Sequence, residues 1–254
     1  MRKKPLIVIL GPTASGKTAL AVKLAKKFNG EIICADSRTI YEGMDIGTAK
    51  PTPKEQKKVV HHLLDIVKPD QKFSVAEFQR LAYKIIDDIH RRKKIPFLVG
   101  GTGLYIDAVC EGFKIPKPAP NSALREKLAQ KSKKELLKIL KEKDPKALEF
   151  VDPNNKRRII RALEVIFTTG KPFSAQRKKS APPYDILKIG LKIPRQKLYQ
   201  RIEKRVDEQI KKGLVEEVKK LYRAGFDFDS PGMTGLGYRQ FKDYILGKAT
   251  LKEA

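Results

Sequence analysis

Cysteine, long apolar runs and acidic residues are all scarce in this sequence of 254 residues. Its two cysteines, Cys34 and Cys110, each lie in an apolar stretch, so we expect reduced, buried thiols and no disulfide framework. No apolar run approaches the roughly 20 residues of a transmembrane helix. The basic residues 1–4 precede an apolar stretch that is too short for a signal peptide. These absences predict a cytoplasmic protein without a membrane partner.

The shortage of acidic residues leaves 29 Asp and Glu against 55 Lys and Arg, a net charge of +26. This excess is larger than solubility requires and favours a polyanionic partner, most often a nucleic acid. A lysine-rich genome would give similar numbers. The excess is denser in the second half, because residues 1–110 carry 20 basic and 11 acidic side chains and residues 111–254 carry 35 and 18. This distribution favours the nucleic-acid partner.

The first motif follows a short apolar run, residues 6–10, that predicts a buried strand. The next eight residues match G-x-x-x-x-G-K-[ST], a loop whose backbone amides and helix N-terminus surround a phosphate group. A chance glycine-rich turn would lack the strand before it and the helical pattern after it. We therefore predict a diphosphate or triphosphate site, with Lys17 on the terminal phosphate and the Thr18 hydroxyl on Mg²⁺. Its residues are Gly11, Pro12, Thr13, Ala14, Ser15, Gly16, Lys17 and Thr18.

Two further apolar runs, residues 31–35 and 95–99, predict strands of the same sheet. Helical patterns separate the runs, so we predict an α/β fold with a doubly wound parallel sheet. Ligands bind beyond the carboxyl ends of such strands. Asp36 directly follows the first run, and the turn 100–105 follows the second. Both are therefore expected at this edge of the sheet, beside the loop at 11–18. A catalytic or substrate-binding role is favoured for Asp36 over that of a turn residue.

The segment 37–52 is long and aperiodic, which is typical of a functional loop. Its residues Tyr41, Met44 and Ile46 favour an ordered loop that faces a ligand. The adjacent His61 and His62 lack a third residue at metal spacing, so we expect them to have a structural or substrate-contacting role.

The character of the sequence changes after residue 112. The proline-rich stretch 115–120 predicts a stiff connector, and residues 121–180 predict a basic, all-helical insertion. The predicted division is a first core part, an insertion and a second core part, at residues 1–114, 115–182 and 183–254.

Two segments are candidates for RNA contacts. Arg157 and Arg161 lie one helical turn apart with Arg158 beside them, which favours phosphate contacts over ordinary solvation. The glycine-rich segment 232–240 contains an aromatic residue and an arginine, which suits RNA, although a tight turn between helices needs the same glycines.

The phosphate loop and Asp36 fit two reactions. In a small-molecule kinase, Asp36 is the base for a hydroxyl while Lys17 and Mg²⁺ assist phosphoryl transfer. In transfer from an allylic diphosphate, the loop stabilises the departing diphosphate and Asp36 deprotonates the incoming nucleophile. The basic insertion favours the second reaction, because a metabolite kinase needs no polyanion-binding surface.

Six segments follow one another along the chain: Gly11–Thr18, Ala35–Ser37, Tyr41–Pro51, His61–Asp65, Val99–Tyr105 and Arg158–Val165. In content and order they resemble the tRNA dimethylallyltransferase family, and the resemblance extends from residue 6 to residue 240. The sequence departs from the family pattern at Gln209, where methionine is common, and at the pair Arg38-Thr39.

The resemblance implies a P-loop-kinase-like core that binds dimethylallyl diphosphate and an insertion that grips the anticodon stem-loop of tRNA. The dimethylallyl group is expected to move to the N6 amine of the adenosine 3′ of the anticodon, which flips out of its stack. Asp36 resembles the general base, Thr102 the hydroxyl beside it and Arg205 the arginine that neutralises the diphosphate. A monomer that uses Mg²⁺ is expected. Positions similar to those that contact tRNA are Asp36, Ser37, Arg38, Thr39, Arg157, Arg158, Ile159, Ile160, Arg161, Thr234, Gly235, Leu236, Gly237, Tyr238 and Arg239.

Overall fold

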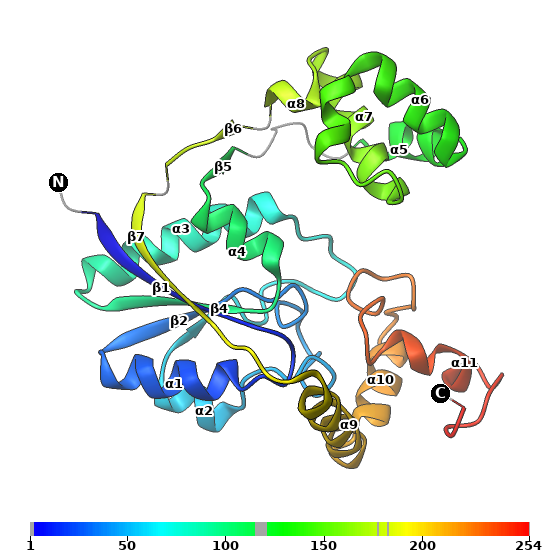
Figure 1. The fold of residues 1–254 in the computed structure, drawn as a ribbon. Coiled ribbons are helices and arrows are strands. Elements are labelled where there is room, and N and C mark those ends of the chain that lie inside the picture. Colours follow the sequence, from blue (N-terminus) through cyan, green and yellow to red (C-terminus); the bar gives the residue numbers. More distant parts are fainter. Residues whose placement is uncertain (1–2, 115–120, 177, 182, 254) are drawn as a thin grey trace. The chain divides into compact units, whose positions relative to one another are not determined.

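The computed structural model describes residues 3–114, 121–176, 178–181 and 183–253 (Figure 1). The chain forms two compact units. The predicted connector at 115–120 and the predicted boundary residues 115 and 182 lie outside the described residues. Unit 1 comprises residues 1–110 and 182–254, and unit 2 comprises residues 111–181.

Unit 1 is built on a parallel sheet of five strands in the order β3-β2-β4-β1-β7. In the central strand β1, Leu10 lies opposite both Gly100 and Gly190. The carboxyl ends of the strands therefore meet at one edge, as the apolar runs predict. The strands are β1 (Lys4–Leu10), β2 (Gly30–Cys34), β3 (His61–His62), β4 (Ile95–Gly100) and β7 (Tyr184–Gly190).

Helices cover both faces of this sheet (Figure 1). Helix α1 packs on the face that carries Ile32 and Cys34, whereas α3 and α4 pack on the face that carries Ile33 and Ala35. Successive residues of β2 thus point to opposite faces, and the predicted doubly wound α/β fold is confirmed. The helices of unit 1 are α1 (Lys17–Lys27), α2 (Pro53–Lys58), α3 (Val75–Arg91), α4 (Gly103–Cys110), α9 (Arg195–Lys211), α10 (Leu214–Arg223), α11 (Lys242–Ile245) and a 3₁₀ helix at Arg239–Phe241.

A second hydrophobic core of unit 1 joins the 37–52 segment to the C-terminal helices. Tyr41 and Met44 are 5% and 0% exposed and belong to one cluster with Leu221 and Tyr238. Tyr41 and Met44 therefore do not themselves face a ligand, whereas Ile46 lines the cleft described below. The apolar surface of the first two is instead buried against α10 and the residues after it, and other residues of the segment face the same cleft.

Unit 2 is mainly helical and has its own core, which includes Leu136, Leu140 and Leu163. The all-helical prediction needs one correction, because β5 (Phe113–Lys114) pairs with β6 (Lys178–Lys179) as a short antiparallel ribbon. Strands of two residues are too short to leave a periodic pattern in the sequence. The helices are α5 (Ser122–Ala129), α6 (Lys133–Lys143), α7 (Lys156–Thr169), α8 (Phe173–Gln176) and a 3₁₀ helix at Pro145–Glu149.

Both cysteines are free and buried, as predicted. Burial raises the pKa of the Cys34 thiol to about 12, so this group stays protonated at neutral pH. None of the helices in the described ranges is long and apolar enough to cross a membrane.

Candidate active site

The loop between β1 and α1 has the geometry of a phosphate site. Gly16 is the N-cap of α1 and has a φ of 90°, a left-handed conformation that favours glycine. The loop amides therefore lead into a helix N-terminus, an arrangement that binds phosphate. Within the described residues, the buried Ser15 hydroxyl has no hydrogen-bond partner, and Ser15 lines a cleft of about 780 Å³. An anionic oxygen in the loop would supply that partner.

Lys17, the first residue of α1, reaches back across the loop. Its Nζ donates a hydrogen bond to the Pro12 carbonyl oxygen at 2.7 Å. Burial lowers the pKa of the Lys17 ammonium group, and the nearby Asp36 carboxylate acts in the opposite direction. A partly desolvated ammonium group interacts more strongly with a phosphate than an exposed one does.

Asp36 follows β2 at the same edge of the sheet. Its Oδ1 accepts a hydrogen bond from the Arg38 amide at 2.8 Å. The Thr102 Oγ1 accepts one from the Ser37 amide at 3.1 Å, and the Thr102 amide donates to the Ala35 carbonyl at 3.3 Å. These bonds join the end of β2 to the start of α4 and fix the turn that carries the carboxylate.

Arg205 comes to the cleft from α9. Burial lowers the pKa of its guanidinium, and the Asp36 carboxylate opposes this shift. The charge of Arg205 also contributes to the lowered pKa of Lys17. Two cations and one carboxylate therefore line one cleft, although they come from α1, α9 and the end of β2. The cations suit a diphosphate, and the carboxylate suits a proton acceptor next to it.

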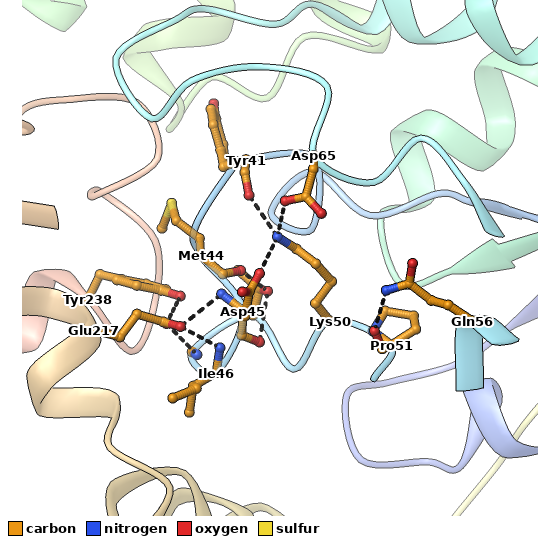
Figure 2. Close-up of polar contacts among 12 residues, drawn as sticks. Tyr41, Met44, Asp45, Ile46, Lys50, Pro51, Gln56, Asp65, Glu217 and Tyr238 are labelled. Atoms are coloured by element: carbon orange, nitrogen blue, oxygen red, sulfur yellow. Dashed lines mark hydrogen bonds and ion pairs between the residues drawn. The ribbon is translucent and has the colours of Figure 1, made fainter. Parts of the chain in front are cut away.

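Residues 45–48 are called here the 45–48 turn. Asp45, Ile46 and Thr48 line the same cleft, and the turn is held by side chains from other elements (Figure 2). Glu217 of α10 accepts hydrogen bonds from three successive amides of this turn and from the Tyr238 hydroxyl. The Lys50 side chain is 4% exposed, and its Nζ forms ion pairs with Asp45 and Asp65. Hydrogen bonds and ion pairs from other elements thus hold this part of the cleft wall.

The two histidines have different surroundings. His62 Nε2 lies 2.8 Å from a carboxylate oxygen of Glu31, which is a structural contact, whereas His61 lines the cleft. The described part of the chain holds no group of three or more His, Cys, Asp or Glu residues placed to bind a metal. Mg²⁺ would therefore take most of its oxygens from the substrate, as it often does in phosphate sites. The Thr18 hydroxyl lines the cleft beside the loop and fits this mode of binding.

Comparison with known proteins shows the family. The sequence profile of IPP transferase matches residues 39–254. A tRNA dimethylallyltransferase of Roseiflexus sp. (strain RS-1) is 52% identical over 254 residues, which cover 98% of this chain and 83% of that protein. The chain belongs to the tRNA dimethylallyltransferase family. A member from Thermomicrobium roseum is 46% identical over 100% of this chain and 78% of its own length.

Solved structures of tRNA dimethylallyltransferases share the fold. The tRNA isopentenylpyrophosphate transferase of Bacillus halodurans has a TM-score of 0.72 at 45% identity, over 99% of this chain and 80% of that chain. A eukaryotic dimethylallyltransferase acting on tRNA has a TM-score of 0.83 at 30% identity, over 96% of this chain and 64% of that one. The resemblance seen in the sequence is thereby confirmed.

Two of the segments that resemble tRNA contacts of dimethylallyltransferases lie together in unit 1. Arg38 Nη1 donates to the Pro231 carbonyl at 2.9 Å, so the turn after Asp36 lies beside the start of the glycine-rich segment 232–240. Thr234, Leu236 and Arg239 are exposed there. Thr39 and Tyr238 differ from them, because they are 6% and 1% exposed. The Tyr238 side chain fills a hydrophobic core and is removed from any surface that RNA could contact.

The third such segment lies on α7 of unit 2. Arg157 and Arg158 are exposed in its first turn. Arg161 is paired with the buried Glu164 at 2.6 Å, and Ile159 is 0% exposed. Arg157 and Arg158 thus face the solvent in this helical turn, whereas Ile159 belongs to the core of the unit.

Sequence reasoning missed three residues that hold one wall of this cleft. Glu217, Gln209 and Lys50 hold the 45–48 turn, yet none was a candidate. Glu217 and Gln209 lie more than 160 positions from their partners in that turn. Spacing along the chain gives no signal for such a contact.

Proposed function

We propose that this chain transfers a dimethylallyl group from dimethylallyl diphosphate to the N6 amine of the adenosine 3′ of the tRNA anticodon, with release of diphosphate. In this reaction the amine nitrogen bonds to C1 of the allylic group, and the bond between C1 and the diphosphate oxygen breaks. Asp36 takes the proton that the amine loses. Thr102 supports this step, because its hydroxyl holds the turn that carries Asp36.

The leaving diphosphate would lie between the phosphate loop and α9. The backbone N–H groups of the 11–18 loop, which Pro12 lacks, and the Ser15 hydroxyl accommodate its oxygens, while Lys17 and Arg205 offset its negative charge. The Thr18 hydroxyl would hold Mg²⁺ together with oxygens of the diphosphate. The metal supplies further charge stabilisation for the departing group.

The RNA would be held by exposed basic groups of both units. Unit 2 contains 19 Lys and Arg residues and 8 Asp and Glu residues, and Arg157 and Arg158 are exposed on α7. In unit 1, the exposed Arg239 belongs to the segment that lies beside the turn after Asp36, and the half-buried Arg38 joins the two segments. The target adenosine has to leave its stack to reach a carboxylate in a cleft, so the proposal includes base flipping. We assign unit 2 to the anticodon stem-loop. Because the substrate is tRNA, we also assign the reaction to the cytoplasm. All the groups named belong to one chain, so a monomer suffices.

The observation that carries this proposal is that Lys17, Asp36 and Arg205 line one cleft in a chain of this family. The test is incubation with dimethylallyl diphosphate, Mg²⁺ and an unmodified anticodon stem-loop, followed by mass spectrometry of the RNA. We expect a mass gain of one dimethylallyl group, and none when guanosine replaces the target adenosine. An unchanged mass in the first reaction, beside an active family member as positive control, would overturn the proposal.

The kinase reaction requires the opposite order of ligand affinities at the phosphate loop. A kinase needs ATP to bind more tightly than dimethylallyl diphosphate, whereas the proposed reaction needs the reverse order. Calorimetry with both ligands in the presence of Mg²⁺ measures this order. Nothing in the comparisons favours the kinase.

A further inference from the structure

Glu217 is the centre of a polar cluster that joins three segments of unit 1 (Figure 2). Its carboxylate accepts hydrogen bonds from the amides of Asp45, Ile46 and Gly47 at 3.0, 2.8 and 3.1 Å. The Tyr238 hydroxyl donates a fourth bond at 2.6 Å. Successive amides that point to one place form a site for an anion, and here the anion is a side chain of the protein itself.

The surroundings of Glu217 leave little freedom for this contact. Tyr238 is 1% exposed, and burial together with the Glu217 carboxylate raises the pKa of its hydroxyl, which therefore stays a donor. The 45–48 turn approaches the tyrosine closely. A Cβ atom on Gly47 would lie 2.5 Å from the Tyr238 ring, so only glycine allows this approach. The cluster thus depends on the side chains of Glu217 and Tyr238 and on the absence of a side chain at Gly47.

The opposite side of the 45–48 turn is attached to α9. Gln209 Nε2 donates to the carbonyl oxygens of Ile46 and, at 3.2 Å, of Gly47. Arg205 precedes Gln209 by four positions, so the two side chains lie on one face of the helix. Arg205 Nη2 makes a longer contact of 3.5 Å with the Thr48 carbonyl oxygen. The amides of the turn therefore face α10, and its carbonyls face the helix that carries Arg205.

We propose that Glu217 is a positioning residue for the transfer reaction. By holding the amides of the 45–48 turn, it presents the turn's carbonyls to α9 and so fixes the Arg205 guanidinium at the cleft. This inference rests on the proposed function, which assigns Arg205 to the leaving diphosphate. Glu217 itself need not touch the substrate.

The test compares Glu217→Gln with Glu216→Gln. The first variant keeps the size of the side chain but replaces an oxygen by an amide NH₂, which cannot accept a bond from a backbone amide. The second is a matched control on the same helix, because Glu216 is exposed and pairs with Lys219 at 2.9 Å. Full-length proteins are assayed for prenyl transfer, for stem-loop binding and by circular dichroism.

Glu217→Gln is expected to lower kcat about 10- to 100-fold, while the Kd for the stem-loop changes by less than about 2-fold, because only the geometry of the leaving group is disturbed. Glu216→Gln is expected to keep the kcat of the wild type. A folded Glu217→Gln protein with the kcat of Glu216→Gln overturns the inference. An equal loss of stem-loop binding also overturns it, because a general structural defect would act in that way.

A double-mutant cycle shows whether Glu217 acts through Arg205. In an Arg205→Ala background, Glu217→Gln should lower kcat by less than about 3-fold more, because the group that it positions is absent. Effects that multiply overturn the inference. If Arg205→Ala alone has the kcat of the wild type, the proposed role of Arg205 fails as well. If Arg205→Ala loses activity and Glu217→Gln does not, only the inference fails.

Tyr238→Phe extends the test in case Glu217→Gln does not fold. It removes one of the four bonds to Glu217 and leaves the amide contacts in place. We expect a loss in kcat of about 2- to 10-fold with unchanged stem-loop binding, since only one of four hydrogen bonds to the carboxylate is removed. A folded Tyr238→Phe protein with the kcat of the wild type then overturns the inference.

Discussion

The Thr102 hydroxyl and the Ser37 backbone amide form a 3.1 Å hydrogen bond that joins β2 to α4 next to Asp36. Thr102→Val removes the acceptor and keeps the shape of the side chain, so the Ser37 amide loses its partner. We expect the free energy of unfolding to fall by about 1 kcal/mol and kcat to fall about 10-fold, because the turn that carries Asp36 is loosened. Urea unfolding and prenyl-transfer kinetics measure the two effects. Thr102→Ser, which keeps the hydroxyl, should behave like the wild type, and equal activity of Val and Ser variants would contradict the prediction.

Replacement of Asp36 separates its two roles. Asp36→Asn keeps an oxygen that can accept the bond from the Arg38 amide but cannot take up the proton of the amine. We expect kcat to fall by about 10²–10⁴-fold with stem-loop binding largely kept, as for loss of a general base. Asp36→Ala should lose as much activity and, in addition, some stability. Single-turnover kinetics and a fluorescence binding assay report the two quantities; a binding defect as large as the kinetic defect would contradict the prediction.

The exposed Arg157 on α7 provides a test of RNA binding. Arg157→Ala should weaken stem-loop binding and reduce the slope of log K against log salt by about 1, because one phosphate contact is lost. Arg91→Ala is the matched control, since Arg91 is 72% exposed on α3 and outside the predicted RNA segments. Binding titrations at several salt concentrations make the comparison. The same slope for both variants would remove Arg157 from the RNA-binding surface.

A pH effect on stability is expected from Glu31 of β2. Its side chain is 2% exposed, and hydrogen bonds from Arg92, with smaller contributions from Lys94 and His62, hold the pKa of the carboxyl well below its ordinary value of 4.5. Because the folded pKa is depressed, the stabilisation is fully present above pH 4.5 and is lost as the pH falls below that value. The difference in unfolding free energy between wild type and Glu31→Gln should therefore be largest near pH 7.

Urea unfolding between pH 7 and pH 3 tests this dependence. The difference should shrink over the acidic part of the range, because the wild-type carboxylate begins to lose its advantage over the neutral amide there. Glu126→Gln serves as the control, since Glu126 is exposed on α5. A difference that is constant with pH would show that Glu31 contributes through packing rather than through its charge.

The part of the site that could be predicted from the sequence is the part that local patterns encode. The strand and glycine loop before Lys17, and the apolar run before Asp36, locate two of the three charged groups at one sheet edge, because parallel strands align their carboxyl ends. The position of Arg205 came from the family resemblance alone. Its helix reaches the cleft only through tertiary packing.

The remainder depends on contacts between distant parts of the chain. An aromatic residue in a glycine-rich segment, such as Tyr238, is compatible with RNA contact and with a buried position, and its environment in the fold decided for the latter. The same holds for Met44, whose apolar side chain could face a ligand or a core. Glu217 received no role from the sequence, because a carboxylate that binds backbone amides requires no particular partner residue types.

The pairing of β1 with β7 has a consequence for the order in which the protein is made. Residues 4–10 gain their neighbour at residues 184–190 only after the whole of unit 2 has been synthesised. Helices close in sequence assemble quickly, whereas strands far apart in the chain pair slowly. On a ribosome, the insertion therefore matures first. A nascent chain that ends before residue 184 would therefore hold the helices of unit 2, while the strand that leads into Gly11 would have β4 as its neighbour but not yet β7.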